Sequence, residues 1–199
     1  MTTPLICGID EVGRGSLAGP LISVATLFIG HATGCPDVDD SKKMTPKRRE
    51  RTFKQLCCSP FLVDFGIGQV SVPEINERGI DWANAESFLR AVNNLPTKPA
   101  HIIIDGVNGL KGGGHHSIQV EPKADGKYPV VSAASILAKV IRDAYMIELD
   151  SLYPGYRWGQ NKGYGTQDHI LGIKSLGATR FHRTRFISKI VSPQTGWSF

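Results

Sequence analysis

The stretch that decides both the fold and the site lies near the N-terminus and reads Leu5-Ile6-Cys7-Gly8-Ile9-Asp10-Glu11-Val12-Gly13-Arg14-Gly15. Its first half is apolar and predicts a buried strand, which ends in the adjacent carboxylates of Asp10 and Glu11. Two such neighbours repel each other at neutral pH unless a positive charge lies beside them. A hard divalent cation is a suitable partner for carboxylate oxygens. Because the glycines that follow allow a backbone to approach a ligand closely, the stretch predicts metal-assisted phosphate chemistry.

The composition of the whole chain is that of an ordinary globular protein. It has 199 residues, of which 41% are hydrophobic and 21% are charged. The net charge of +5 favours a polyanionic partner. The four cysteines show no C-x-x-C spacing, and the N-terminus lacks a signal-peptide pattern, so we expect a reduced, cytoplasmic protein. No apolar run approaches the roughly 20 residues that span a bilayer, so we expect no membrane association.

Hydrophobic periodicity predicts an order of strands first and helices later. Strands are expected at 5–10, 21–29, 61–70, 101–105 and 117–121. Helices are expected from Thr45-Pro46 onward, over 73–94 with a break near Gly79, over 131–152, and from Thr166 to Gly177. This order predicts an α/β fold with a mixed β-sheet flanked by helices. Residues 1–152 are expected to form the catalytic core, and residues 153–199 a small C-terminal helical extension that binds substrate.

Three carboxylates lie at the C-terminal ends of predicted strands, where open α/β sheets usually bind ligands. If the first strand and 102–105 are neighbours, Asp10 and Asp105 meet at that edge. Adjacent strand residues point to opposite faces, so Glu11 joins them only if the strand distorts at its end. A single acid of this kind is usually a solvated loop residue. Three acids together at strand ends favour a metal site.

The glycine stretch also has a second interpretation. Gly13-Arg14-Gly15-Ser16-Leu17-Ala18 fits the G-x-G-x-x-G/A dinucleotide-binding pattern. That pattern must open a helix, because the helix N-terminus holds the pyrophosphate. Here Gly19-Pro20 and a β-branched run follow, which predict a strand. The context therefore disfavours a dinucleotide site.

Five motifs, in order along the chain, resemble those of type 2 ribonucleases H, the ribonuclease HII family. The opening Gly8-Ile9-Asp10-Glu11-Val12-Gly13-Arg14-Gly15 is similar to the family's signature. The others are Asp40-Ser41-Lys42-Lys43, then Ile104-Asp105-Gly106, then Ser132-Ala133-Ala134-Ser135-Ile136-Leu137-Ala138-Lys139-Val140 with Arg142-Asp143, and finally Lys162-Gly163-Tyr164-Gly165-Thr166. The resemblance extends over most of the chain.

The resemblance implies an RNase H-like fold and a metal-dependent endoribonuclease of DNA replication and repair. Such an enzyme hydrolyses the RNA strand of RNA·DNA hybrids and incises at ribonucleotides embedded in duplex DNA, leaving 5′-phosphate and 3′-hydroxyl ends. The resemblance also implies four acidic residues that hold Mg²⁺ or Mn²⁺ for a two-metal mechanism. Asp10, Glu11 and Asp105 match directly, and Asp125 matches through Lys123-Ala124-Asp125.

The resemblance assigns substrate contacts as well. It implies that the backbone of Gly13, Arg14 and Gly15 reads the ribose 2′-hydroxyl, the group that separates RNA from DNA. Tyr164 is expected to pack at the junction sugar. Ser41 and Lys42 are expected to bind substrate, with Lys42 on phosphates. The loop from Lys111 to His116 matches no motif of the family.

The remaining charged residues receive simpler interpretations. Lys139 and Asp143 are expected to form an i,i+4 ion pair rather than a metal site. Residues 47–51 predict a solvated basic helix face. Arg180, Arg183 and Arg185 predict a basic surface that follows phosphates.

Two further hypotheses concern partners and activity. We expect a monomer, with Gln194-Thr195-Gly196-Trp197-Ser198-Phe199 as a candidate contact for a sliding-clamp-like partner. The alternative to an enzyme is a catalytically silent nucleic-acid-binding module on the same fold. The presence of Asp10, Glu11, Asp105 and Asp125 argues against that alternative.

Overall fold

The computed structural model of the chain describes residues 4–29, 44–106 and 117–191. Several predicted features lie outside these ranges. They are Ser41 and Lys42, the loop from Lys111 to His116, and the C-terminal residues 194–199.

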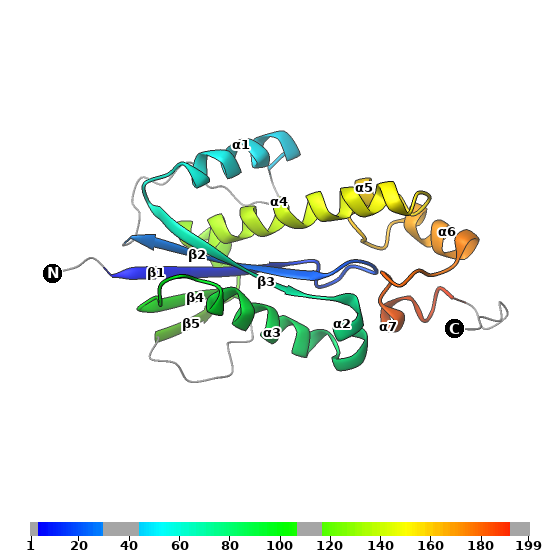
Figure 1. Cartoon of the computed structure of the whole chain (residues 1–199), viewed down its shortest axis with the longest axis horizontal. Coiled ribbons are helices and arrows are strands. Elements are labelled where there is room, and N and C mark those ends of the chain that lie inside the picture. The colour runs from blue at the N-terminus through cyan, green and yellow to red at the C-terminus, as the bar shows by residue number, and fades with distance from the viewer. Residues whose placement is uncertain (1–3, 30–43, 107–116, 192–199) are drawn as a thin grey trace.

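A five-stranded mixed sheet forms the centre of the molecule, in the order β3-β2-β1-β4-β5 (Figure 1). The strands are β1 (Leu5–Val12), β2 (Leu21–Ile29), β3 (Leu62–Val70), β4 (His101–Asp105) and β5 (Ser117–Glu121). β2 runs antiparallel to both β1 and β3, whereas β4 is parallel to β1 and to β5. The prediction of a mixed sheet is therefore confirmed. β1 is two residues longer than expected, because Glu11 and Val12 still pair with Ser23 and Ile22.

Helices cover both faces of the sheet (Figure 1). They are α1 (Pro46–Cys57), α2 (Val72–Arg78), α3 (Ile80–Asn93), the 3-10 turn η1 (Ala124–Gly126), α4 (Pro129–Leu152), α5 (Trp158–Asn161), α6 (Gln167–Leu176) and α7 (Thr184–Ile187). The hydroxyls of Thr45 and Thr166 accept the backbone N–H of Arg48 and His169, so these threonines cap α1 and α6 and both predicted helix starts are confirmed. The predicted break between α2 and α3 falls at Gly79, whose φ is +88°.

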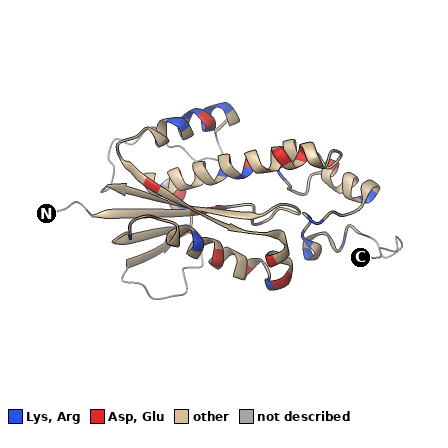
Figure 2. Cartoon of the chain, in the orientation of Figure 1, with Lys and Arg blue, Asp and Glu red and all other residues tan. Residues whose placement is uncertain are grey.

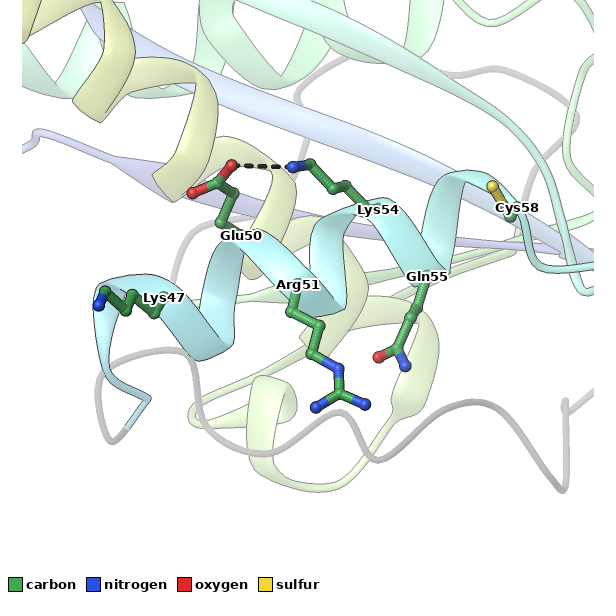
Figure 3. Close-up of a pocket in the computed structure, with 6 residues that line it drawn as sticks. All are labelled: Lys47, Glu50, Arg51, Lys54, Gln55 and Cys58. Atoms are coloured by element: carbon green, nitrogen blue, oxygen red, sulfur yellow. Dashed lines mark ion pairs between the residues drawn. The ribbon is translucent and has the colours of Figure 1, made fainter.

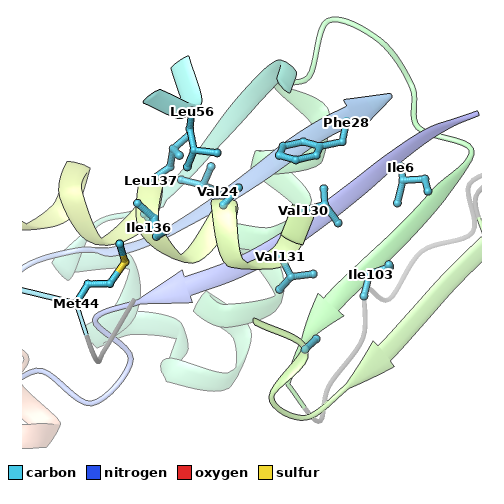
Figure 4. Packing of buried hydrophobic residues seen from close by; sticks show 13 residues of the cluster. Ile6, Val24, Phe28, Met44, Leu56, Ile103, Val130, Val131, Ile136 and Leu137 are labelled. Carbon is cyan, nitrogen blue, oxygen red and sulfur yellow. The ribbon is translucent and has the colours of Figure 1, made fainter. Parts of the chain in front are cut away.

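The long helix α4 lies against β1 because a glycine leaves room for it. A Cβ built on Gly8 would lie 2.5 Å from the backbone of Val130 and Val131. The Thr26 hydroxyl, on β2, donates to the Val130 carbonyl at 2.6 Å and ties the start of α4 to the sheet. The core of this layer packs Ile6, Val24, Phe28, Leu56, Ile103, Val130, Val131, Ile136 and Leu137 (Figure 4). This contact aligns α4 with the strand that carries Asp10.

The opposite face of the sheet packs against α3, with Phe88 fully buried among strand residues such as Ile9 and Ile104. Two large apolar residues on the helices lie outside the core. Leu89 is 40% exposed because it follows Phe88 on the helix and points away from the sheet, and Ile147 is 54% exposed. Along that part of α4 the buried stripe runs through Met146 and Leu149 instead.

The C-terminal segment packs on the second half of α4 through its own apolar cluster. This cluster is Ala18, Met146, Leu149, Tyr156, Trp158, Ile173 and Ile187. The segment also bonds the loop between β1 and β2, since the Leu17 N–H donates to the Gly163 carbonyl at 2.8 Å and the Gly19 N–H to the Phe181 carbonyl at 2.9 Å. The loop after Asp10 and Glu11 therefore lies between the sheet and the C-terminal helices.

Among the helices of the described ranges, none combines the length and the apolar character needed to cross a bilayer.

Candidate active site

Two aspartates meet at one edge of the sheet, as the sequence predicted. β1 and β4 are parallel neighbours in which Ile9 pairs with Ile104, so Asp10 and Asp105 come next on adjacent strands. Strand alternation places Asp105 on the same face as Ile103, which packs in the α4 layer. Both carboxylates therefore approach α4 rather than α3.

A third aspartate reaches the same point from η1. One carboxylate oxygen each from Asp10, Asp105 and Asp125 lies within 4.8 Å of the others, and Asp10 and Asp125 are buried. The Ala124 N–H donates to Asp105 Oδ1 at 3.1 Å, which joins η1 to the end of β4. Three carboxylates converge here from a strand, a strand end and a turn distant in sequence.

The electrostatics of this group favour a bound cation. The pKa of Asp10 is raised from 3.8 to about 8, by burial first and then by the negative charges of Glu11 and Asp105, against hydrogen bonds from Ser135 and the Glu11 N–H that lower it. Three anionic carboxylates this close are unfavourable without positive charge between them. Oxygen ligands of this kind and number suit a hard divalent cation, so the residues fit such a metal.

Glu11 lines the cleft but lies outside the group of three. β1 remains regularly paired through Val12, so the distortion that the sequence argument required for Glu11 is not seen in this strand. Glu11 still lines the same cleft as Asp10, and its negative charge raises the pKa of Asp10. Its place is therefore the rim of the site.

The carboxylates open into a cleft of about 430 Å³. Its walls are Asp10, Glu11, Val12, Gly13, Arg14, Gly15, Asp105, Ser135, Lys139 and Tyr164. The glycine loop and Tyr164 thus lie in the same cleft as the carboxylates. The loop is followed by β2 and not by a helix, so the dinucleotide interpretation lacks the helix N-terminus that it requires.

The two glycines of the loop differ in what surrounds them. Gly13 has a φ of +92°, and a Cβ there would overlap the guanidinium of Arg142. Gly15 has no such φ, and a Cβ built on it would meet no atom within 4 Å. The fold itself therefore requires glycine at position 13 and not at position 15.

Sequence reasoning assigned no function to Arg142, whose side chain hydrogen-bonds this loop from the interior of the protein. Its fully buried guanidinium donates to the carbonyls of Pro20, Ala18 and Lys162 and to the Ser16 hydroxyl at 2.8–3.0 Å. The signal was present in the sequence, because Arg142 lies four residues from both Ala138 and Met146 on the buried stripe of α4. A charged residue on such a stripe indicates a buried polar network.

Tyr164 lies beside two cations at the wall of the cleft. The centre of its half-buried ring is 5.7 Å from the Arg142 guanidinium and 5.9 Å from the Lys139 ammonium. Its carbonyl is bonded by His169 Nδ1 at 2.9 Å. The predicted Lys139–Asp143 ion pair is confirmed at 2.7 Å and orients the lysine next to the cleft.

Two arginines predicted to be solvated are buried. Arg183 was expected on a phosphate-following surface, but it is fully buried and bonds main-chain carbonyls, because residues 181–183 pair with 17–19. Arg49 was expected on a solvated helix face, but it is 8% exposed, donates to the Met44 carbonyl and lies 3.6 Å from Asp143. Arg180 and Arg185 are exposed, as predicted.

A larger hollow, of about 500 Å³, lies over α1 and is not a comparable site. Its walls are Lys47, Glu50, Arg51, Lys54, Gln55 and Cys58 (Figure 3). They come from α1 and its C-cap, and Glu50 and Lys54 pair with each other at 3.0 Å. Figure 2 shows the basic residues that gather on this helix. The side chains that line this hollow do not converge on one point, as the three aspartates do.

The fold and the site define the class of protein. A mixed sheet of this order, with Asp10 and Asp105 side by side on the neighbouring strands β1 and β4, is that of RNase H-like metal-dependent nucleases. The ribonuclease HII family model matches residues 7–189. Ribonuclease HII of Prochlorococcus marinus subsp. pastoris is 42% identical over 188 residues, covering 92% of this chain and 88% of that protein. The chain therefore belongs to the ribonuclease HII family and is a metal-dependent endonuclease.

Solved structures agree with this assignment. The ribonuclease H2 of Pyrococcus horikoshii OT3 superposes with a TM-score of 0.75 at 31% identity, covering 94% of this chain and 96% of that one. The RNase HII in a PCNA:RNase HII complex from Archaeoglobus fulgidus superposes with a TM-score of 0.73 at 25% identity, covering 91% of this chain and 94% of that one. The RNase H-like fold is thus shared over nearly the whole chain.

Proposed function

We propose that this enzyme hydrolyses the RNA strand of RNA·DNA hybrids and incises at single ribonucleotides within duplex DNA, leaving 5′-phosphate and 3′-hydroxyl ends. The observation that carries the proposal is one cleft that Asp10 and Asp105 line together with the glycine loop and Tyr164, with an Asp125 carboxylate oxygen within 4.8 Å of theirs. The first group suits metal-assisted phosphodiester cleavage, and the second suits recognition of a ribose.

The proposed metal ligands are Asp10, Glu11, Asp105 and Asp125, and the proposed metal is Mg²⁺ or Mn²⁺. Bound divalent metals in such sites activate the attacking water and stabilise the leaving 3′-oxygen. The chain's own residues prepare that chemistry. Ser135 hydrogen-bonds Asp10, and the Ala124 N–H fixes the Asp105 carboxylate, so both ligands are oriented by neighbours.

The proposed ribose contact is the backbone of the loop formed by Gly13, Arg14 and Gly15. Ser16 holds the Gly13 carbonyl through its N–H and hydroxyl, at 3.3 and 2.8 Å, so the loop is rigid on its inner side. Its outer side faces the cleft. An N–H donor there suits the 2′-oxygen, which a deoxyribose lacks.

Other substrate contacts are proposed from the sequence. Ser41 and Lys42 are proposed substrate contacts, with Lys42 on phosphates, and residues 153–199 are proposed as the substrate-binding extension of a core at 1–152. We further propose a sliding-clamp-like partner for the C-terminal residues 194–199. Support comes from the A. fulgidus relative, whose structure is described as a PCNA complex. Co-elution of the full chain with a clamp, lost on deletion of 194–199, would support this contact.

The test of the activity is nicking of a labelled DNA duplex that carries one ribonucleotide, compared with the same duplex made only of DNA. Cleavage is expected at the ribonucleotide with Mg²⁺ or Mn²⁺ and none with a chelator. Mapping of the product ends distinguishes a 3′-hydroxyl from a 3′-phosphate. Binding without cleavage at any metal concentration would instead identify a silent nucleic-acid-binding module.

Alanine at the two loop glycines is expected to separate folding from recognition. Gly13→Ala should lower the melting temperature, because its Cβ would overlap the buried Arg142 and its φ is positive. Gly15→Ala should melt like wild type and yet cut a single ribonucleotide about tenfold more slowly, since the methyl group would stand in the cleft. Equal melting temperatures and rates for Gly15→Ala and wild type would exclude this loop from ribose recognition.

The exposed arginines of the extension are expected to set the salt dependence of duplex binding. The double variant Arg180→Ala/Arg185→Ala should flatten the slope of log affinity against log salt concentration by about one unit per lost phosphate contact. The position of cleavage should stay the same, because phosphate contacts position the duplex but do not distinguish one nucleotide from another. Lys98→Ala is the control, since this exposed lysine precedes β4 at the end opposite Asp105. An unchanged slope in the double variant would show that this surface faces away from the duplex.

A further inference from the structure

Arg183 bonds the glycine loop from within the protein. Its Nη1 donates to the Arg14 carbonyl at 2.9 Å, and its Nε and Nη2 donate to the Gly19 carbonyl at 3.1 and 2.8 Å. The side chain is fully buried. One guanidinium therefore fixes two peptide groups of the loop between β1 and β2, and one of them lies between Arg14 and Gly15.

The position of Arg183 is itself well determined. Its backbone N–H donates to the Leu17 carbonyl at 2.8 Å, and His182 pairs with Ala18 in an isolated antiparallel bridge. The segment that carries the guanidinium thus runs alongside the loop that the guanidinium bonds.

The orientation of the Arg14 carbonyl determines that of the next N–H. In a planar trans peptide the C=O and the N–H point in opposite directions, and the described residues contain no cis peptide bond. Because the Arg14 carbonyl points inward to Arg183, the Gly15 N–H points outward. Gly15 is exposed at the wall of the cleft, and within the described ranges its N–H donates no hydrogen bond.

Stability alone does not favour this arrangement. Burial of a charged group carries a desolvation cost that well-packed apolar residues of similar volume avoid. The three hydrogen bonds of the Arg183 guanidinium go to main-chain carbonyls, and burial together with the neighbouring Arg142 lowers its pKa to about 9. At neutral pH it therefore remains a charged, fixed donor, and its effect is to hold the loop in one orientation.

We propose that Arg183 is a positioning residue that presents the Gly15 N–H as the hydrogen-bond donor for the ribose 2′-oxygen. The inference rests on the proposed function of this cleft, and it assigns part of the ribose selectivity to a side chain that never touches the substrate. Loss of the guanidinium frees the peptide between Arg14 and Gly15 to rotate, so the donor is no longer preorganised.

The test is selective binding, measured without divalent metal at one fixed salt concentration. Affinity is compared between a DNA duplex with one ribonucleotide and the same duplex made only of DNA. Arg183→Met, which keeps the bulk and removes the donors, should lower the ratio of the two affinities about two- to tenfold, the effect of one net hydrogen bond. Arg183→Lys, which keeps a charged donor, should restore part of the ratio.

A control variant separates this effect from simple loosening of the C-terminal segment. Tyr156→Phe removes the hydrogen bond from the Tyr156 hydroxyl to the Gly177 carbonyl and leaves the glycine loop untouched. It should lower the melting temperature and keep the affinity ratio of wild type. A ratio that stays at the wild-type value in folded Arg183→Met would overturn the inference.

A second measurement needs no variant and remains available if Arg183→Met does not fold. The amide resonance of Gly15 in the full chain should shift on addition of the ribonucleotide duplex and shift much less with the all-DNA duplex. Equal shifts would overturn the proposed donor. Wild type that binds the two duplexes equally would instead contradict the proposed function of the cleft, so the two failures are distinguishable.

Discussion

Asp10→Asn is expected to reduce cleavage by about a thousandfold or more while the protein remains folded. Asp10 is the most buried member of the aspartate group and a proposed metal ligand, and a bound metal in such a site supplies several kcal/mol of transition-state stabilisation. The amide oxygen of Asn can still accept the Glu11 N–H that Asp10 Oδ1 accepts at 2.8 Å. We therefore expect the backbone around position 10 to keep its conformation in this variant.

The same variant is expected to be more stable than wild type in the absence of metal. The pKa of Asp10 is raised from 3.8 to about 8, so folding favours its protonated form. For an acid this means that wild type loses stability as the pH rises from about 4 to about 8, because the unfolded chain ionises freely and the folded one does not. Each pKa unit is worth about 1.4 kcal/mol. Asp10→Asn lacks this loss, so its advantage should be absent near pH 4 and largest at and above pH 8.

With divalent metal present, wild type should become more stable than Asp10→Asn. Wild type should gain melting temperature on addition of Mg²⁺ or Mn²⁺, because binding to the folded state alone stabilises it, and Asp10→Asn should gain much less. Asp143→Asn serves as the control, because Asp143 pairs with Lys139 and Arg49 outside the aspartate group. Wild-type turnover in Asp10→Asn, or an equal response of both proteins to metal, would contradict the assignment of the metal site.

The sequence predicted the sheet and the meeting of Asp10 with Asp105 because both depend on local patterns, whereas Asp125 was assigned only through the family resemblance. β4 is a short, mostly apolar run, and Asp105 is its last residue. Asp10 occupies the equivalent place on β1, and parallel pairing brings the two together. Caps such as Thr45 and breaks such as Gly79 are also set by their own residues, which is why the helix boundaries were predictable.

The buried arginines were not predictable in this way, because their partners are distant in the chain. Arg142 bonds carbonyls of the loop more than 100 residues earlier, and so does Arg183. Nothing near Arg183 in the sequence distinguishes it from Arg180 or Arg185, which are exposed. Its burial follows from the pairing of 181–183 with 17–19, a tertiary contact that periodicity does not encode. The sequence therefore predicted Arg183 as a surface charge, whereas in the structure it is buried and bonds the loop between β1 and β2.

Tyr164→Ala is expected to impair cutting at an isolated ribonucleotide more than cutting within a long RNA strand. The Tyr164 ring lies at the wall of the cleft, close to the cations of Arg142 and Lys139, and its carbonyl is held by His169. An aromatic ring packed on a nucleic-acid moiety contributes about 1–3 kcal/mol, which corresponds to roughly ten- to a hundredfold here. A single ribonucleotide offers one junction sugar, so the loss should be greatest with that substrate.

The deciding measurement is the ratio of the two cleavage rates for wild type, Tyr164→Ala and Tyr164→Phe. If the ring acts by packing on the sugar, Tyr164→Phe should keep most of the ratio and Tyr164→Ala should lose it. If the hydroxyl contributes a hydrogen bond near the ribose, Tyr164→Phe should lose part of the ratio at an unchanged melting temperature. If Tyr164 merely packs the segment before α6, both rates should fall together with stability in Tyr164→Ala. A constant ratio would therefore show that Tyr164 supports the fold and does not read the junction.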